Sequence, residues 1–383
     1  MATSAGAVAT GAAVLVARFS GSPRSDLKNI ASNRLCRPSS ENHPPPPIHH
    51  LPKLLLLLGL LVLPACAGST EAQRDARPAP DPTAATVLPE GFTYPEGDSL
   101  RVATWNAEHF VDRHDNPYID AEREDDPPDT MRARRERFAR AVRRLDADVL
   151  VLQEFESAAY AERLAEERFP EMGYEFFAAT ESRGWYMNVV LMSRVPLGVV
   201  ERYAGVTTPI VGQTNDEGAP AAQNFTNNRL WTAEVFGRPG YTFTLAGLHL
   251  KAGPDARDAA WRTGQIRFLR RQLSDLTNAR PGANVLVAGD LNSLPGSSEL
   301  QLLLNGNPGD GSGLQLIDPL AGRETLTHPA GAPERQLDYL LVNEAMRPEL
   351  ARGSVRVASP LPSGAQARTS DHLPILATVV ARE

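Results

Sequence analysis

From Leu100 to the end of the chain, apolar segments of strand length alternate with segments of helical periodicity. Of all features of the sequence, this alternation most restricts the folds that the chain can adopt. Two amphipathic helices are expected, one beginning after Asp129 or Thr130 and the other over about 259–276, each with an apolar stripe at helical spacing. Strands are expected at 101–105, 148–152, 188–192, 230–236, 242–250, 285–288, 337–342 and 374–381. The pattern favours a layered α/β fold and one domain over residues 99–383.

Residues 1–66 read as a leader rather than as part of the fold. Lys53 precedes an uninterrupted apolar run over 54–63, which is too short to span about 30 Å of hydrocarbon as a helix but has the layout of a secretory signal. The run ends in Leu63-Pro64-Ala65-Cys66, which resembles a bacterial lipobox. We therefore expect export, lipidation of Cys66 and anchoring to the membrane of the cell envelope. The alternative is a plain cleavable signal and a secreted protein, and we expect the true start to lie downstream of Met1.

Residues 67–98 contain Ala, Pro, Asp, Glu and Thr without periodicity, which predicts a flexible linker. The formal net charge is −7, from 39 basic and 46 acidic residues. Removal of residues 1–66 takes away six basic and two acidic residues and leaves −11, so no general basic field attracts a polyanion. Two cysteines, Cys36 and Cys66, are too few for a disulfide framework.

Polar side chains follow the apolar strands directly, at the points where the chain turns. A buried carboxylate is costly unless it is paired or bound to a cation, so carboxylates and imidazoles placed in this way indicate one shared site. Oxygen ligands favour Mg²⁺ or Mn²⁺ over zinc. Taken singly, each segment has a structural explanation such as a solvated loop acid, a turn, a helix cap or a core histidine. The segments are Thr104-Trp105-Asn106, Gln153-Glu154, His249-Leu250-Lys251, Gly289-Asp290-Leu291-Asn292, Gln336-Leu337-Asp338-Tyr339 and Ser370-Asp371-His372-Leu373-Pro374.

In this order the segments resemble the endonuclease/exonuclease/phosphatase superfamily, and the resemblance covers about residues 100–382. It implies a four-layer α/β/β/α sandwich, in which two packed mixed β-sheets are flanked by helices. It also implies hydrolysis of phosphate esters by in-line attack of water, assisted by a divalent metal such as Mg²⁺ or Mn²⁺. The resemblance makes Glu154 the main metal ligand, with help from Asn106, and Asp371 completes the metal shell or a second site.

The same resemblance assigns catalytic roles to five residues. Asp290 would orient or deprotonate the attacking water, Asn292 would donate to the phosphate, and His249 would bind a non-bridging oxygen. His372 would contact the phosphate or transfer a proton, with Asp338 fixing its tautomer. Asp290 and the Asp338–His372 pair are both chemically able to act as the general base. Three further residues are weaker candidates for substrate binding, and each also has a structural explanation: Arg229, Lys251 and Asn188.

Three functions are compatible with these residues. The first is an extracytoplasmic nuclease, the second a phosphatase or a phospholipase C-type, sphingomyelinase-like hydrolase of a small or lipid phosphate, and the third a catalytically silent binding module. We expect a monomer. The acidic segment from Asp112 to Asp129 would repel a long nucleic acid if it lies near the site, and it either holds a structural Ca²⁺ or is a solvated loop. The arginine-rich helix over 132–144 is interpreted as a solvated face.

Overall fold

The computed structural model describes residues 88–181, 184–223, 229–307 and 313–381. The predicted signal, the lipobox with Cys66 and most of the predicted linker lie outside these residues. Within the described ranges, no helix combines the length and the apolar character needed to cross a membrane.

The first sheet of the described chain has six strands, with β1 and β2 parallel and every other neighbouring pair antiparallel. Its strand order is β13 (Arg356–Val357), β14 (Ile375–Val380), β1 (Ser99–Phe110), β2 (Val149–Phe155), β4 (Asn188–Ser193) and β3 (Phe176–Ala179).

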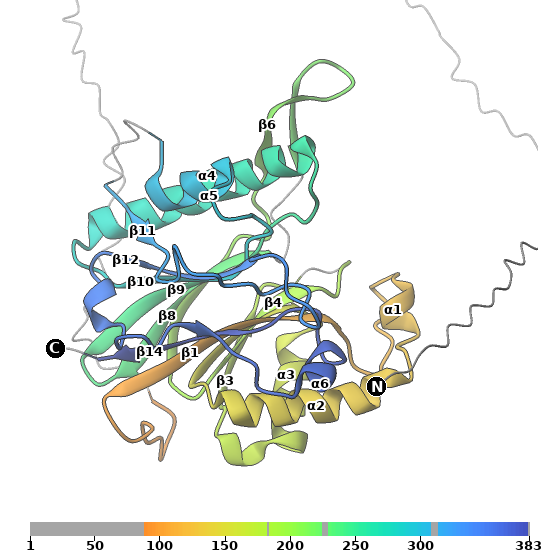
Figure 1. Cartoon of the computed structure of the whole chain (residues 1–383), viewed down its shortest axis with the longest axis vertical. Coiled ribbons are helices and arrows are strands. Elements are labelled where there is room, and N and C mark those ends of the chain that lie inside the picture. The colour runs from red at the N-terminus through yellow and green to blue at the C-terminus, as the bar shows by residue number, and fades with distance from the viewer. Residues whose placement is uncertain (1–87, 182–183, 224–228, 308–312, 382–383) are drawn as a thin grey trace, which may run out of the picture. The chain divides into compact units, whose positions relative to one another are not determined.

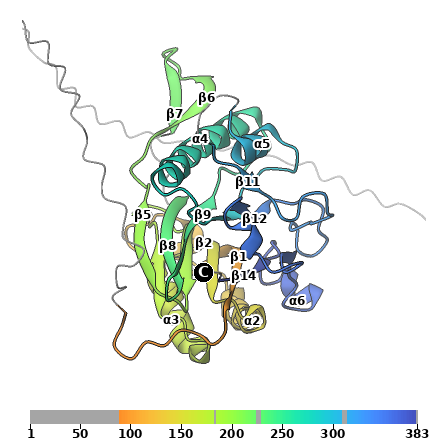
Figure 2. The ribbon, with the colours of Figure 1, turned by 90° about the vertical axis from the view of Figure 1, so that its left-hand side faces the viewer.

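The second sheet also has six described strands, and here β9 and β10 form the parallel pair. Its order is β11 (Leu316–Ile317), β12 (Asp338–Asn343), β10 (Val285–Asp290), β9 (Tyr241–His249), β8 (Leu230–Arg238) and β5 (Leu197–Arg202). A separate hairpin packs against the long helix α4 (Ala256–Ala279) and consists of β6 (Thr208–Thr214) and β7 (Pro220–Gln223) (Figure 2).

Helices cover the outer faces of both sheets (Figures 1 and 2). The first sheet is covered by α2 (Thr130–Leu145) and α3 (Ala158–Arg168), and the second by α4 (Ala256–Ala279) and α5 (Ser298–Asn305). The remaining described helices are short and lie in connections: α1 (Glu122–Asp125), α6 (Ser363–Ala367) and 3₁₀ turns at Pro170–Met172 and Arg347–Glu349.

The alternation of side chains along each strand builds the layers. In β1, Val102 packs between the two sheets, whereas its neighbour Ala103 packs toward the helices of the first sheet. In β10, Leu286 lies between the sheets and Val287 faces α4 and α5. Among the described residues, three apolar clusters therefore separate four layers. The predicted α/β/β/α sandwich is confirmed.

The eight strands and two helices expected from periodicity are present, with small differences at their ends. The elements that were not expected, such as β5, β6 and β7, are short and partly exposed, so neither a continuous apolar run nor a strict alternation marks them. The hairpin β6–β7 spans residues 208–223, where no strand was expected.

Strand direction brings the predicted polar segments to one end of the sandwich. The carboxyl ends of β9 and β10 lie together, with His249 opposite Asp290, and the antiparallel β12 begins there with Asp338. In the first sheet, β1 reaches Asn106 at the same end. These four residues continue the inward-facing positions of their strands, so they lie where the apolar layer between the sheets ends.

Candidate active site

Asn106 connects the two sheets at this end of the sandwich. Its Nδ2 donates to Asp290 Oδ2 at 3.0 Å and to Glu154 Oε1 at 3.3 Å. Asn106 is 1% exposed and Asp290 2% exposed, whereas the side chain of Glu154 is 17% exposed. One amide thus holds two carboxylates close together, one buried and one open to solvent.

Asp338 and His372 form a buried pair. His372 Nδ1 lies 2.8 Å from Asp338 Oδ2, and its other nitrogen, Nε2, lies 3.9 Å from Asp290 Oδ2. Burial alone lowers the pKa of His372, but the carboxylates of Asp338, Asp290 and Asp371 outweigh it and raise the pKa to about 10. With Asp338 accepting from Nδ1–H, the proton on Nε2 faces the neighbouring carboxylates.

The carboxylate of Asp290 lies close to both His249 and His372. Its Oδ1 accepts from the backbone N–H of Asn292 at 2.8 Å, and its Oδ2 lies 3.8 Å from His249 Nε2. Burial raises its pKa to about 7; Asp338 adds to this effect, while His372 opposes it. The carboxylate therefore titrates near neutral pH.

His249 is buried and neutral. Its Nε2 lies 3.7 Å from Glu154 Oε1, and its Nδ1 has no hydrogen-bond partner among the described residues. Burial lowers its pKa well below the ordinary value, and the positive charges of Arg229 and His372 lower it further. The side chain can donate from Nε2 without adding a charge.

The backbone is strained around Glu154. Of the five non-glycine residues with a clearly positive φ in the described chain, four belong to this region: Glu108, His109, Glu154 and Asn292. Such conformations cost free energy and are concentrated at functional sites. Here they turn the His109 backbone N–H onto Glu154 Oε2 at 3.0 Å and place the His109 ring 3.6 Å from the same oxygen.

Asp371 belongs to a second group beside the first. Its carboxylate lies 3.3 Å from His328 Nε2 and 3.8 Å from His372 Nε2, and the rings of the two histidines are 4.7 Å apart. Its backbone N–H donates to Glu108 Oε2 at 3.0 Å. This geometry groups Asp371 with His328 and His372, and its role as a ligand to a metal stays a prediction.

The side chains of Ser370 and Arg134 stabilise the backbone next to the site residues through hydrogen bonds. Ser370 Oγ donates to Asn106 O at 2.6 Å and accepts from the backbone N–H of His372 at 2.9 Å. Arg134 donates to the carbonyls of Thr369, Ala107 and Glu108. Arg134 is 6% exposed, so the interpretation of the α2 arginines as a solvated face is wrong for this residue.

The three weaker substrate-binding candidates differ in their surroundings. The charges of Glu154 and Asp290 act on the Arg229 guanidinium, whose pKa burial lowers, which places this cation beside the site. Lys251 Nζ instead pairs with Asp258 on α4 at 2.9 Å. Asn188 donates to the carbonyls of Glu156 and Tyr186. These contacts give Lys251 and Asn188 a structural explanation, and their roles toward substrate stay predictions.

Sequence reasoning missed four residues of this region. His109 lies in the irregular part of β1 between Asn106 and Phe110, and no simple periodicity places it; His328 lies outside the named strands and pairs with Arg335. A signal was present for Arg134, because it stands three residues after Met131 and four before Phe138, on the buried face of α2. Ser370 stands in the same short segment as Asp371 and His372.

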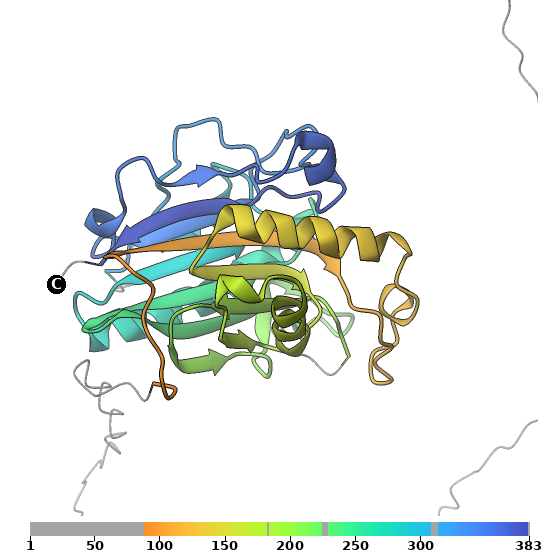
Figure 3. The same cartoon turned by 90° about the horizontal axis from the view of Figure 1, so that it is seen from below.

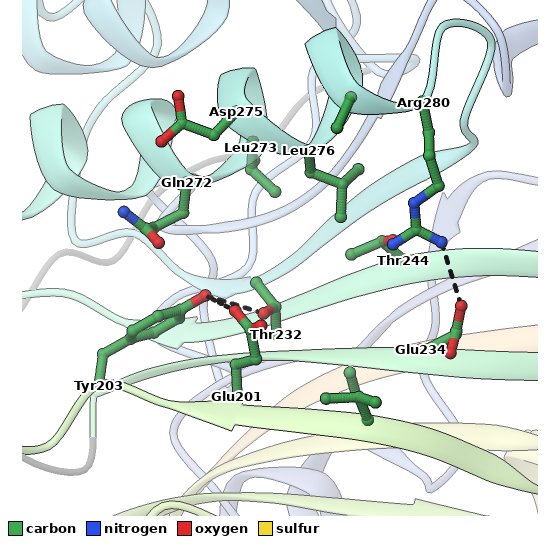
Figure 4. Close-up of a pocket in the computed structure, with 13 residues that line it drawn as sticks. Glu201, Tyr203, Thr232, Glu234, Thr244, Gln272, Leu273, Asp275, Leu276 and Arg280 are labelled. Atoms are coloured by element: carbon green, nitrogen blue, oxygen red, sulfur yellow. Dashed lines mark hydrogen bonds and ion pairs between the residues drawn. The ribbon is translucent and has the colours of Figure 1, made fainter. Parts of the chain in front are cut away.

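A separate pocket of about 420 Å³ lies between the second sheet and α4 (Figure 4). Tyr203 hydrogen-bonds there to Glu201 and Thr232, and Arg280 pairs with Glu234. It opens on the α4 side of the sheet, whereas the polar residues described above face the space between the sheets.

The donor set fits a hard divalent cation. Glu154 and Asp290 converge on one amide, and Asp338 Oδ1 is buried without a hydrogen-bond partner among the described residues. A carboxylate brought this close to others is stabilised by a cation. Asp290, Asp338 and His372 also offer three ligand atoms within 4.8 Å of one another.

The sequence model of the Endonuclease/Exonuclease/phosphatase family matches residues 103–372, well over half of the chain. No curated protein matches. Similar solved structures include TDP2 from D. rerio with a single-strand DNA product (18% identity, 74% of this chain, 99% of that chain, TM-score 0.48) and SmcL (15%, 73%, 99%, 0.48). An endonuclease/exonuclease/phosphatase from Beutenbergia cavernae shares 22% identity over 74% of this chain and 72% of that chain, with a TM-score of 0.45.

These distant structural likenesses decide nothing about activity. The family model is stronger, because its match runs from β1 to His372 and includes all the candidate site residues from Asn106 to His372. The chain therefore belongs to the Endonuclease/Exonuclease/phosphatase family, whose members are hydrolases acting on phosphoesters.

Proposed function

We propose that this chain is a divalent-metal-dependent phosphodiester hydrolase that acts on nucleic acid outside the cytoplasm. One observation supports the proposed hydrolysis: five polar residues meet at the end of the layer between the two sheets, namely Asn106, Glu154, Asp290 and the Asp338–His372 pair. The arrangement combines oxygen ligands for a cation with a carboxylate and an imidazole that can move protons.

Glu154 would hold the metal, with Asn106 orienting the carboxylate and Asp371 available to a second ion. A bound Mg²⁺ or Mn²⁺ would stabilise negative charge on the phosphoryl oxygens and on the leaving oxygen. Glu154 is better suited to this role than Asp290 because it is more open to solvent, while its oxygens remain fixed by Asn106 and by the His109 backbone.

Asp290 would take the proton from the attacking water. A general base works best when its pKa lies near the operating pH, and the pKa of Asp290 is raised to about 7. A cation bound nearby would oppose the effect of burial and favour the ionised form, which can accept a proton. His372 is less suited to this role, because with a pKa of about 10 it is already protonated at neutral pH.

His372 would instead donate from Nε2 to a phosphoryl oxygen, while Asp338 holds Nδ1. His249, neutral and buried, would donate to a non-bridging oxygen without repelling the cation. Asn292 completes the arrangement, because its backbone N–H fixes Asp290 and its own Nδ2 is bound to Leu250 O at 3.1 Å. Arg229 would add positive charge at the second sheet.

The proposed location rests on the sequence. The basic residue, the short apolar run and the lipobox-like ending at Cys66 favour export and a lipid anchor. A protein held at the envelope would encounter nucleic acid from the surroundings. Mass spectrometry of the mature chain tests the anchor: diacylated Cys66 at the N-terminus supports it, and a chain that begins elsewhere without lipid contradicts it.

A small or lipid phosphate is a second candidate, favoured by the acidic segment that follows β1. Asp112 in this segment accepts from His114, and its backbone N–H donates to Glu156, two residues beyond Glu154. The acidic segment therefore begins close to the site. Long nucleic acids gain binding affinity when cations of the protein neutralise their phosphates. The acidic segment would repel these phosphates and so weaken binding.

Hydrolysis of a bis(p-nitrophenyl) phosphate reporter by the full-length chain tests the chemistry. We expect turnover with Mg²⁺, none with EDTA, and losses on the order of 10²-fold or more for Asp290→Asn and for His372→Ala. His114→Ala, which removes an exposed histidine, is the matched control and should retain activity. Wild-type rates in both site variants would contradict the assignment.

A substrate panel with equal Mg²⁺ separates the two candidates. Plasmid DNA, single-stranded DNA, RNA, sphingomyelin vesicles and inositol phosphates would be compared at matched phosphate concentration. Preference for nucleic acid supports the proposal. Preference for sphingomyelin or an inositol phosphate would replace it by the second candidate, and turnover of none of them with correct folding would favour a binding module.

A further inference from the structure

The acidic segment between β1 and α2 contains a second group of carboxylates, distinct from the active-site carboxylates. The segment extends past the end of β1 and includes the short helix α1 (Figure 3). Within it, Asp115, Glu124 and Asp125 each present a carboxylate oxygen, and the three oxygens lie within 4.8 Å of one another.

Glu124 is the unusual member. It is 1% exposed, although Asp115 and Asp125 are exposed. One of its oxygens, Oε1, accepts from the backbone N–H of Asn116 at 2.9 Å. The other, Oε2, is buried and has no hydrogen-bond partner among the described residues. A buried carboxylate oxygen without a donor or a cation is costly, because it has lost its water.

The charges nearest to Glu124 make this worse. Burial raises the pKa of its carboxyl, and the carboxylates of Asp115, Asp125 and Asp112 raise it further. Asp112 is already paired with Arg163 and is tied to the base of the segment through its backbone. Three carboxylates therefore repel one another at close range, and a cation bound between them would offset this repulsion: those of Asp115, Glu124 and Asp125.

We propose that Asp115, Glu124 and Asp125 bind a Ca²⁺ ion that fixes the segment between β1 and α2. Ca²⁺ accepts six to eight oxygen ligands in irregular geometry, whereas Mg²⁺ demands a near-ideal octahedron. Two exposed carboxylates leave room for water in the coordination shell. The proposed Ca²⁺ site shares no ligand with the active site, because Glu154, Asp290 and Asp338 are not part of it.

The ion would also support the active site indirectly. The segment it holds continues from Glu108 and His109: the Glu108 carboxylate accepts from the backbone N–H of Asp371, and the His109 backbone N–H donates to Glu154. A cation at Glu124 would therefore restrain the segment beyond His109. The contacts of Asp112 with Glu156 and Arg163 would restrain the part of the segment next to β1.

Thermal unfolding of the full-length chain tests the ion directly. With Ca²⁺ at a hundred times its dissociation constant, we expect Tm to rise by on the order of 4 °C in the parent chain and in its Glu122→Gln variant, which changes an exposed neighbour on α1. We expect no rise in Glu124→Gln. In EDTA, Glu124→Gln should be at least as stable as the parent chain, because the amide removes the repulsion.

The measurements are made in a Glu154→Gln background, so that ion binding at the active site does not contribute. The Asp115→Asn/Asp125→Asn variant, which changes exposed residues only, should also lose the Ca²⁺ response. Trypsin gives a local readout, since Arg113 and Arg123 are exposed in the same segment. Ca²⁺ should slow cleavage there by about tenfold or more in the Glu122→Gln control and not in Glu124→Gln.

Either of two results would overturn the proposal. One is a Ca²⁺ response in Glu124→Gln equal to that of the control, which would place the ion elsewhere. The other is a Glu154→Gln chain whose Tm and cleavage rates are unaffected by Ca²⁺. A response to Mg²⁺ equal to the response to Ca²⁺ would contradict the choice of ion.

Discussion

Replacing Asp338 by Asn isolates the effect of one buried charge on His372. Asp338 is fully buried, and its Oδ2 lies 2.8 Å from His372 Nδ1. The asparagine keeps an oxygen that can accept from Nδ1–H but removes the negative charge. The pKa of His372 should then fall from about 10 toward its ordinary value of 6.5, although Asp290 and Asp371 still raise it.

The consequence for stability follows from proton linkage. Because the folded-state pKa of His372 is raised, its contribution is fully present below about pH 6.5 and is lost as the pH rises through about 10. Each pH unit over which only the folded chain holds this proton changes the free energy of unfolding by about 1.4 kcal/mol. Between pH 7 and pH 10 the proton on His372 should therefore account for a loss of about 4 kcal/mol in the metal-free wild type.

Urea unfolding in EDTA at several pH values measures this loss. We expect Asp338→Asn to show less than half of the pH-dependent change between pH 7 and pH 10. Asp275→Asn, an exposed control on α4, should match the wild type. With Mg²⁺, Asp338→Asn should lose on the order of 10²-fold in kcat/KM. If the free energy of unfolding depended on pH equally in Asp338→Asn and in the wild type, the charge of Asp338 would not be what raises the pKa of His372.

Three further perturbations test the supports of the site. Arg134→Met should lower the free energy of unfolding by about 3 kcal/mol in urea titrations, because it strands buried carbonyl groups, whereas the exposed Arg132→Met should change it by less than about 0.5 kcal/mol. Ser370→Ala should reduce kcat/KM about tenfold and also lower Tm, since it leaves Asn106 O and the His372 backbone N–H without this partner; an unchanged rate would contradict this. Gly289→Ala should destabilise more than Gly282→Ala in thermal unfolding, because both positions have positive φ but only at Gly289 would the added Cβ meet Leu248 O, at 1.9 Å.

The convergence of the polar residues could be predicted because it depends on strand order and direction. Asp290 and His249 end neighbouring parallel strands, so a correct reading of two strands is sufficient to bring them together. Asp338 follows from the same logic, because β12 runs antiparallel and begins where β10 ends. Period-two alternation then fixes the face on which these side chains lie.

The remaining contacts depend on geometry that no periodicity encodes. His109 reaches Glu154 only because the backbone turns through positive φ at Glu108 and His109. His328 approaches Asp371 from a loop paired with Arg335. The burial of Glu124 within an acidic segment likewise results from the path of a short loop, and charge composition alone predicts exposure there.

Anomalous scattering from crystals soaked in Mn²⁺ would show whether Glu154 binds a divalent ion, because it locates the ion without reference to turnover. We expect an anomalous peak within about 2.0–2.4 Å of a Glu154 carboxylate oxygen, beside Asn106 and facing Asp290. The peak should disappear in Glu154→Gln crystals. Mn²⁺ bound away from Glu154 while the enzyme is active would contradict a metal-dependent site at the meeting of the two sheets.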